Sequence, residues 1–309
     1  MKRFCFLPGV IGVLLGLIVD LSAQVVREPG EVVFCAYNVK NYLKMQRFVD
    51  GQRTEGVGKP EREIKAVVKF LTEINADVVG LTEIGSKEDL EDLRSRLKKN
   101  GIDYPHVEHA HGGDPVRCQG LLSKLPIVAR DSQKSLTYKL GEVVFPLQRG
   151  ILDVTLQTAG GARFRCMGVH LKSKREVPEA DESLMRRNEA ALLRQHVEAV
   201  LVKAPETELL VYGDFNENSH EAPMVELRGR SRAELSLSDV KLVDTRGQTW
   251  TYYWAAADVY SRFDYVLANR ALMKRVNMKS SYVYDVPDFL TGSDHRPVVV
   301  KLGFGDVKK

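Results

Sequence analysis

Cysteine and net charge are both scarce in this sequence, and the shortage of cysteine excludes a class of protein. The chain has 309 residues and four cysteines, too few for a small domain held together by a disulfide framework. Its formal net charge is only +4. A balance this mild neither requires nor excludes a polyanionic substrate, so any basic surface that binds one must be local.

Internal repeats, low-complexity tracts and obvious inter-domain linkers are also missing. No glycine-rich phosphate loop follows the first strand-like run of the chain, which argues against a Rossmann dinucleotide-binding fold. The hydrophobic fraction of 44% is that of a globular protein, and the length suits one large domain or two small ones.

The first 23 residues have the pattern of an export signal. Lys2 and Arg3 precede an apolar stretch from Phe4 to Val19, and the small residues Ser22 and Ala23 follow. A basic start, an apolar centre and small residues before a cleavage point are typical of a signal peptide. We therefore expect cleavage after Ala23 and a secreted or periplasmic protein with no membrane span. An uncleaved N-terminal anchor is the alternative, although the apolar stretch is short for one.

Three cysteines follow this segment, at positions 35, 118 and 166. In an oxidising compartment an odd number allows at most one internal disulfide. Cys35 and Cys166 lie in apolar, strand-like runs, where a buried free thiol is the expected state.

Four short apolar runs share one design, in which a buried strand leads to a polar residue. The runs are Val32–Tyr37, Asp77–Leu81, Phe164–Val169 and Leu209–Tyr212, and they lead to Asn38, Glu83, His170 and Asp214. Runs of this length that are rich in β-branched and aromatic residues predict strands.

Three further segments predict helices. Residues 60–76 carry apolar side chains at helical spacing, Ser86 and Asp89 form a capping box for a second helix that Gly101 ends, and a third helix is expected from Glu182 to Lys203. Strands outnumber helices. We therefore expect an α+β fold, a four-layer α/β/β/α sandwich in which two packed, mostly antiparallel sheets are flanked by helices.

The strand ends carry the residue types that hydrolysis of a phosphate ester needs. Eight such residues lie at predicted strand ends or beside them: Asn38, Glu83, His170, Asp214, Asn216, Asp264, Asp294 and His295. Carboxylates bind a hard cation such as Mg²⁺, and a His–Asp pair can activate water. A single polar residue at a strand end is an ordinary turn, but eight of these types together predict a site.

The motifs that contain these residues resemble those of the endonuclease/exonuclease/phosphatase superfamily. They are YNV at 37–39, LTEI at 81–84, LLSKLPI at 121–127, VHLKS at 169–173, GDFN at 213–216, SRFDYV at 261–266 and SDHRPV at 293–298. Each motif is weak alone, but all seven occur in the same order. The resemblance implies that residues 24–309 form one catalytic domain of this type.

The resemblance implies a divalent-metal site. Glu83 is the expected direct ligand, and Asn38 and Asp294 complete its ligand shell or bridge to it through water. Mg²⁺ is the expected ion, with Mn²⁺ and Ca²⁺ as alternatives. Lys40 stands where apurinic endonucleases and their close relatives usually carry an acid, a departure that favours a one-metal site.

Catalytic roles follow from the same resemblance. His295, oriented by Asp264, acts on the water or holds the scissile phosphate, and Asp214 positions or deprotonates the nucleophile. Either Asp214 or His295 is the base. Asn216 and His170 donate hydrogen bonds to the phosphoryl oxygens as negative charge builds in the transition state.

Three cations are expected to bind the substrate: Lys40, Arg149 and Lys172. With Lys174 they would form a basic rim able to follow a phosphate backbone. The alternatives are a solvated side chain for Lys40 and structural ion pairing for Arg149. Arg296 is expected to form an ion pair near its strand rather than to touch the substrate.

Two other stretches have less certain meaning. The histidine-rich segment HVEHAHGGD, at 106–114, matches no standard zinc spacing. The segment WTYYW, at 250–254, places Trp250, Tyr252 and Trp254 on one face, where core packing and base stacking are both open.

We therefore expect an exported, Mg²⁺-dependent phosphodiesterase, most specifically a monomeric, endonuclease-like nuclease that acts on nucleic acid without a stable protein partner. A sphingomyelinase-like phospholipid phosphodiesterase and an inositol polyphosphate phosphatase are alternative enzymes. A non-catalytic binding protein on the same scaffold is the third alternative. The fold alone cannot choose among these substrates.

Overall fold

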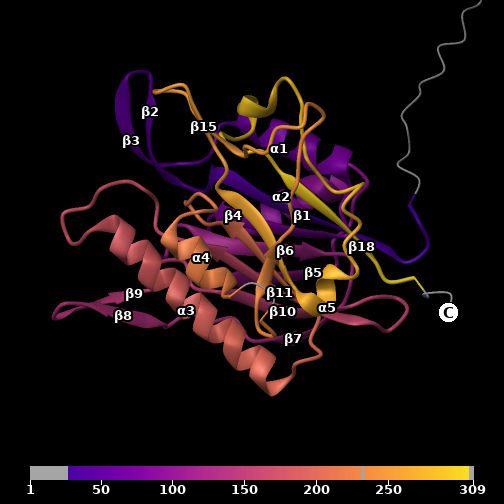
Figure 1. Cartoon of the computed structure of the whole chain (residues 1–309). Coiled ribbons are helices and arrows are strands. Elements are labelled where there is room, and N and C mark those ends of the chain that lie inside the picture. Colours follow the sequence, from indigo (N-terminus) through magenta and orange to yellow (C-terminus); the bar gives the residue numbers. More distant parts are fainter. Residues whose placement is uncertain (1–26, 231–232, 306–309) are drawn as a thin grey trace, which may run out of the picture.

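Two six-stranded sheets lie face to face and carry helices on their outer faces (Figure 1). The computed structural model describes residues 27–230 and 233–305, so the predicted signal peptide at 1–23 lies outside the described residues. The predicted four-layer α/β/β/α sandwich is confirmed. Within the described residues, no helix has the length and apolar character needed to cross a membrane.

The first sheet has the strand order β17-β18-β1-β4-β6-β5. Strands β1 and β4 are parallel, and the other neighbours are antiparallel. Its strands are β1 (Glu31–Tyr42), β4 (Val78–Ile84), β5 (His106–Ala110), β6 (Cys118–Ser123), β17 (Tyr282–Val283) and β18 (Val298–Gly303).

The second sheet has the order β13-β16-β12-β11-β10-β7. Only β11 and β12 are parallel neighbours in it. Its strands are β7 (Ile127–Arg130), β10 (Leu152–Gln157), β11 (Arg163–His170), β12 (Leu209–Asp214), β13 (Leu237–Asp239) and β16 (Asp264–Asn269). Each sheet therefore has one parallel pair near its centre.

Three two-stranded hairpins extend from the sandwich. They are β2 (Met45–Val49) with β3 (Gln52–Val57), β8 (Thr137–Leu140) with β9 (Val143–Pro146), and β14 (Tyr252–Trp254) with β15 (Val259–Ser261). The β2–β3 and β8–β9 hairpins both project on the left of Figure 1.

The predicted helices form and cover the outer faces of the sheets. Helices α1 (Glu61–Ile74) and α2 (Lys87–Lys99) pack on the first sheet, and α3 (Glu182–Lys203) and α4 (Ala222–Arg228) pack on the second. The capping box of Ser86 and Asp89 is present at the start of α2. Two short elements, α5 (Arg270–Met273) and the 3₁₀ helix η1 (Phe289–Thr291), complete the chain.

Strand β1 shows why its sequence is apolar on both faces. Val33, Cys35 and Tyr37 pack in the cluster beneath α1 and α2. The alternate residues Val32, Phe34 and Ala36 pack against the second sheet. Because successive strand residues point to opposite faces, a strand in an inner layer has no solvated face.

The cysteines are buried within these layers. Cys35, Cys118 and Cys166 are all buried, and no disulfide joins any of them in the part of the chain that the structure describes. Burial raises the pKa of the Cys118 thiol to about 11. Neutral buried thiols of this kind are packing groups.

Gly80 of β4 allows the two sheets to approach at their centre. A Cβ atom at this position would lie 2.0 Å from Cε2 and 2.4 Å from Cζ of Tyr212 in β12. The Tyr212 ring is completely buried between the sheets. The close approach therefore depends on the missing side chain.

Gly80→Ala should lower the free energy of unfolding by about 2 kcal/mol, because the added methyl group must displace a buried ring. The measurement is urea unfolding followed by circular dichroism. Gly58→Ala is the matched control, since a Cβ there has no other atom within 4 Å. Equal unfolding midpoints for the two variants would contradict the prediction.

Candidate active site

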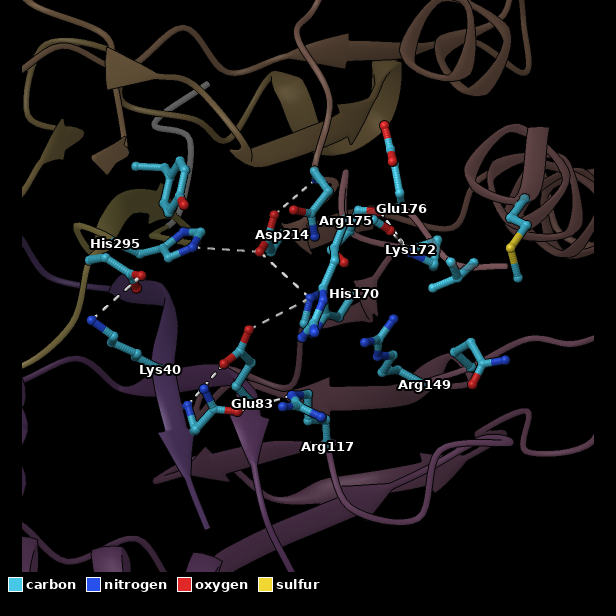
Figure 2. A pocket seen from close by; sticks show the side chains of 18 of the residues that line it. Lys40, Glu83, Arg117, Arg149, His170, Lys172, Arg175, Glu176, Asp214 and His295 are labelled. Carbon is cyan, nitrogen blue, oxygen red and sulfur yellow. Dashed lines mark hydrogen bonds and ion pairs between the residues drawn. The ribbon is translucent and has the colours of Figure 1, made fainter. Parts of the chain in front are cut away.

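The predicted site residues meet at one edge of the sandwich. A cavity of about 750 Å³ is lined by Glu83, His170, Asp214, Asn216, Asp294 and His295, together with several cations (Figure 2). The other two predicted residues, Asn38 and Asp264, are buried and contact this lining. The parallel pairs β1–β4 and β11–β12 bring the strand ends together, with His170 directly opposite Asp214.

The predicted hydrogen bond between His295 and Asp264 is present. Nδ1 of His295 lies 2.8 Å from Oδ2 of Asp264, and Nε2 lies 3.7 Å from Oδ2 of Asp214. Burial alone would disfavour the imidazolium, but the surrounding carboxylates outweigh it and raise the pKa of His295 to about 10. The imidazole is therefore held as a cation between two acids.

Asp214 lies at the centre of the cluster. Oδ2 accepts a hydrogen bond of 2.9 Å from the side-chain amide of Asn38 and lies 3.7 Å from Nε2 of His170. The backbone N–H of Asn216 donates to its other oxygen at 2.9 Å. Burial raises the pKa of the Asp214 carboxyl to about 7, against the opposing effect of the His295 cation.

Glu83 faces the same cavity from β4. Its Oε1 lies 3.9 Å from Nε2 of His170, and its Oε2 accepts a hydrogen bond of 2.9 Å from the backbone N–H of Asn41. Burial, with Arg149 next in effect, lowers the pKa of His170 well below its ordinary value. His170 is therefore neutral and can donate or accept a hydrogen bond without adding charge.

The side-chain amide of Asn38 presents its nitrogen to the acids. Nδ2 lies 2.9 Å from Asp214 and 3.3 Å from Glu83, whereas Oδ1 accepts a hydrogen bond from the backbone N–H of Lys40. A metal would bind the amide oxygen. In this orientation the amide aligns the two acids, and the role of Asn38 in the metal's ligand shell stays a prediction.

A strained turn follows Asn38. Lys40 and Asn41 have φ angles of 44° and 52°, in the left-handed region that costs residues with a Cβ free energy. The ammonium of Lys59, whose side chain is fully buried, donates to the carbonyl of Lys40 at 3.0 Å. Arg47 from β2 donates to the carbonyl of Asn41 at 2.8 Å. These contacts hold the N–H of Asn41 against Glu83.

The donor set suits a hard divalent cation. Ligand atoms of Glu83, His170 and Asp214 lie within 4.8 Å of one another, and Asp294 lines the same cavity. Two carboxylates this close repel one another, and a bound cation would relieve the repulsion. The oxygen donors of Glu83 and Asp294 are the ligand type that Mg²⁺ prefers.

The predicted substrate-binding cations occupy unlike environments. Lys40 is half-exposed, with its ammonium 3.6 Å from Asp294. Lys172 is buried and donates to the backbone carbonyls of residues 173 and 175, which leaves little of its ammonium for a substrate. Lys174 is paired with Glu217. Lys172 and Lys174 therefore already have partners within the chain, and the basic rim stays a prediction.

Arg149 differs from those lysines. It is 9% exposed and lines the cavity, and its Nε and Nη1 have no hydrogen-bond partner among the described residues. The nearest acid, Asp114, is 3.8 Å away. Figure 2 shows Arg149 beyond His170, with Arg117 beside it. A buried guanidinium in this state is ready to receive an anion.

Sequence reasoning missed several groups at the site. Arg117 lines the cavity and donates to the side chain of Asn41 at 2.9 Å. Lys59 and Arg47 support the strained turn described above. No local pattern marks these residues, because their partners lie 6 to 76 positions away in the chain.

Arg296 behaves as expected. It is fully buried and lies 2.9 Å from Asp244 and 3.4 Å from Asp285. In the segment at 250–254, Tyr252 lines the cavity with its ring centroid 4.7 Å from that of His295. Trp254 is 53% exposed, so the three aromatic residues do not share one environment.

A second group of possible ligands lies on the second sheet and α3, where Asp131, Asp153 and His196 come together. Arg165 donates to Asp153 at 2.7 Å and to Asp131 at 2.7 Å. The guanidinium already compensates these carboxylates. The arrangement is therefore that of a structural ion-pair network.

The sequence profile of the Endonuclease/Exonuclease/phosphatase family matches residues 37–295. No curated protein sequence matches the chain significantly.

Solved structures share the fold at low sequence identity. The human Nocturnin catalytic domain with bound sulfate anion is 16% identical, with a TM-score of 0.60 over 88% of this chain and 94% of that one. An endonuclease/exonuclease/phosphatase family protein from Bacteroides thetaiotaomicron is 16% identical, with a TM-score of 0.60 over 90% and 96%. Sphingomyelinase C from Streptomyces griseocarneus is 16% identical, with a TM-score of 0.57 over 88% and 99%.

Asp264→Asn should lower the pKa of His295 by roughly 1–3 pH units, because it removes the carboxylate in closest contact with the imidazolium. The measurement is an NMR titration of His295 in protein freed of metal with EDTA. Asp103→Asn is a surface control. A His295 titration that is unchanged in Asp264→Asn would contradict the assigned pair.

The same substitution has a predicted effect on stability. The pKa of His295 is about 10 in the folded protein and near 6.5 in an unfolded chain, so the charged imidazole stabilises the fold fully below about pH 6.5. That contribution is lost as the pH rises through 10. The difference in unfolding free energy between wild type and Asp264→Asn should therefore be largest near pH 6 and shrink in alkaline solution.

Lys59→Met should weaken Mn²⁺ binding roughly 10–100-fold, the usual range for partners that orient a metal ligand. Without the ammonium, the Lys40–Asn41 turn can relax and withdraw its N–H from Glu83. Isothermal titration calorimetry measures the affinity directly. Lys65→Met, an exposed change on α1, is the control, and equal affinities in the two variants would contradict the positioning role.

Proposed function

The chain belongs to the endonuclease/exonuclease/phosphatase family, and on that premise we propose that it is a metal-dependent phosphodiesterase that cleaves nucleic acid. One observation carries the proposal. The Asp214 carboxylate lies 3.7 Å from both His170 and His295, in a cavity that also contains Glu83. In this set, Glu83 can bind a cation and Asp214 can accept a proton. The two imidazoles can donate hydrogen bonds to an anionic group.

Glu83 and Asp294 are the residues that would hold a divalent metal, and Mg²⁺ suits their oxygens. When bound, the ion supplies positive charge that stabilises the negative phosphoryl group. Asn38 acts behind them, because its amide nitrogen contacts both Glu83 and Asp214.

We assign Asp214 as the base. His295 lies between Asp264 and Asp214, and an imidazolium held by two carboxylates has no lone pair with which to accept a proton. The oxygen of the attacking water forms a bond to phosphorus, and the Asp214 carboxylate accepts a proton from that water. The bond from phosphorus to the leaving oxygen then breaks, and that oxygen takes a proton from bulk water.

The remaining groups hold the phosphate. Neutral His170 and cationic His295 face the space beside Asp214 and are placed to donate to phosphoryl oxygens. Asn216 donates its side-chain amide to the carbonyl of Leu171 at 3.1 Å, so it orders the segment that directly follows His170. Arg149, whose Nε and Nη1 have no hydrogen-bond partner among the described residues, offers its guanidinium to a substrate anion.

Nucleic acid is the proposed substrate because the cavity lining includes cations beside the acids: Lys40, Arg117, Arg149 and Arg175. Phosphate contacts from such groups supply most of the non-specific affinity for a polyanion. We also propose export as a monomer with one catalytic domain at 24–309. The basis for export is the pattern of residues 1–23, and these lie outside the described part of the chain.

Purified residues 24–309 should cleave plasmid DNA in the presence of Mg²⁺ and lose this activity with EDTA. Glu83→Gln should reduce the rate by at least roughly 100-fold, since it removes the charge of the principal ligand while it keeps an acceptor for the Asn41 N–H. Gel electrophoresis of the plasmid measures the rate. Glu88→Gln, an exposed change on α2, is the matched control.

The same preparations should be assayed in parallel on sphingomyelin and on inositol polyphosphates. Turnover of a lipid or an inositol phosphate without DNA cleavage would overturn the nuclease assignment and leave the hydrolase. Absence of any metal-dependent hydrolysis in folded protein would favour the non-catalytic alternative.

A further inference from the structure

A second cavity, of about 1120 Å³, adjoins the active site. Four aromatic residues, Trp250, Tyr253, Tyr260 and Phe289, form part of its lining, and we call it the aromatic pocket. The ring centroids of Tyr253 and Tyr260 are 4.5 Å apart in a stacked arrangement, and those of Trp250 and Phe289 are 5.4 Å apart. The rings form one continuous wall.

Arg296 packs against one side of this wall of rings, and the other side is partly exposed to solvent. The guanidinium carbon of Arg296 lies 3.4 Å from the centroid of Trp250, and Arg296 also donates to the Trp250 carbonyl. In contrast, Tyr260 is 53% exposed and Leu290 is 48% exposed. A rigid aromatic wall that stays partly in water is typical of a binding surface.

Strand β14 separates the aromatic pocket from the catalytic cavity. Tyr252 lines the catalytic cavity, and the next residue, Tyr253, lines the aromatic pocket, because successive strand residues point to opposite faces. The backbone N–H of Tyr253 donates to the carbonyl of Asp294 at 2.9 Å. The two pockets therefore share a wall one strand thick.

Charged groups lie beside the rings of the pocket. Arg296 already occupies one face of Trp250, and Arg246 lines the cavity with a side chain that is 62% exposed. Asp285 also lines the cavity, 3.2 Å from Arg246 and 3.4 Å from Arg296, so these cations are partly balanced while the Arg246 side chain stays open to solvent. A flat, neutral ring that belongs to an anionic chain suits both the aromatic surface and the exposed guanidinium.

We propose that the aromatic pocket binds an unpaired nucleobase of the nucleic acid whose phosphodiester lies in the catalytic cavity. The inference rests on the proposed nuclease function and extends it, since stacking requires a base outside a duplex. It assigns single-stranded nucleic acid as the preferred substrate class.

Tryptophan fluorescence tests the contact, because the chain contains only two tryptophans. Trp254→Phe removes the exposed one and leaves Trp250 as the reporter. The titrant is a thymidine hexanucleotide, with EDTA present to prevent cleavage. A hexamer of abasic sugar phosphates, which has the same charges and no bases, is the matched ligand. We expect the thymidine hexamer to quench Trp250 and the abasic hexamer to leave it unchanged.

Substitution of Tyr260 tests the contribution of a ring. Tyr260→Leu in the Trp254→Phe background should weaken binding of the thymidine hexamer roughly tenfold, whereas Tyr260→Phe, which keeps the ring, should not. Binding of the abasic hexamer, measured by fluorescence anisotropy of a labelled copy, should be the same in all three proteins. Cleavage of bis-p-nitrophenyl phosphate, which has no base, should also be unchanged.

Two results would overturn the inference. The first is DNA cleavage by a protein whose Trp250 emission ignores the thymidine hexamer, which would leave the nuclease function intact. The second is a Trp250 emission shift with sphingomyelin vesicles but none with the hexamer, which would assign the pocket to a lipid surface. Failure of the nuclease function itself would appear separately, as a lack of metal-dependent cleavage of both plasmid DNA and a single-stranded oligonucleotide.

Discussion

A carboxylate buried as fully as that of Asp214 can stay in the protein only with partners, because an isolated charge is poorly solvated away from water. This requirement links the two sheets. Asp214 ends a strand of the second sheet, Asn38 reaches it from the first, and His295 approaches from the segment that precedes β18. The site is thus part of the interface between the sheets, and its geometry depends on how closely they pack.

Backbone strain accompanies this arrangement. Lys40, Asn41, Glu83 and Asn216 all have positive φ angles and lie in or beside the cavity. Each conformation costs about 1–3 kcal/mol and persists only when surrounding contacts enforce it. Here the enforcing contacts are charged groups, such as Lys59 on the Lys40 carbonyl. The strained turn directs the backbone N–H of Asn41 toward Glu83. In a regular strand, that N–H would point to a neighbouring strand.

The sequence predicted the features that depend on local pattern. Strand ends, three helices and the capping box at Ser86 were accessible because periodicity and turn chemistry act over a few residues. The amide orientation of Asn38 could not be predicted in this way, since it depends on which groups contact the amide nitrogen and oxygen in the folded chain. Lys172 shows the same limit. Its position after His170 suggested a substrate contact, but loop carbonyls that bind its ammonium appear only in three dimensions.

The residues around the catalytic groups, which would contact a substrate, lie in a different part of the structure from the catalytic groups themselves. The acids and imidazoles come from strand ends, which the sandwich holds in place, whereas the groups around them come from the β2–β3 and β14–β15 hairpins and from loops. Hairpins and loops can change without loss of the sheets, so related folds can carry different substrate surfaces on one catalytic set. In this chain, Arg149 lines the catalytic cavity with two guanidinium nitrogens that lack hydrogen-bond partners among the described residues, and the aromatic pocket lies on the other face of the strand that carries Tyr252. On the proposed function, these two features would suit a ligand that alternates charge with flat rings, because a guanidinium and an aromatic surface would flank the catalytic acids.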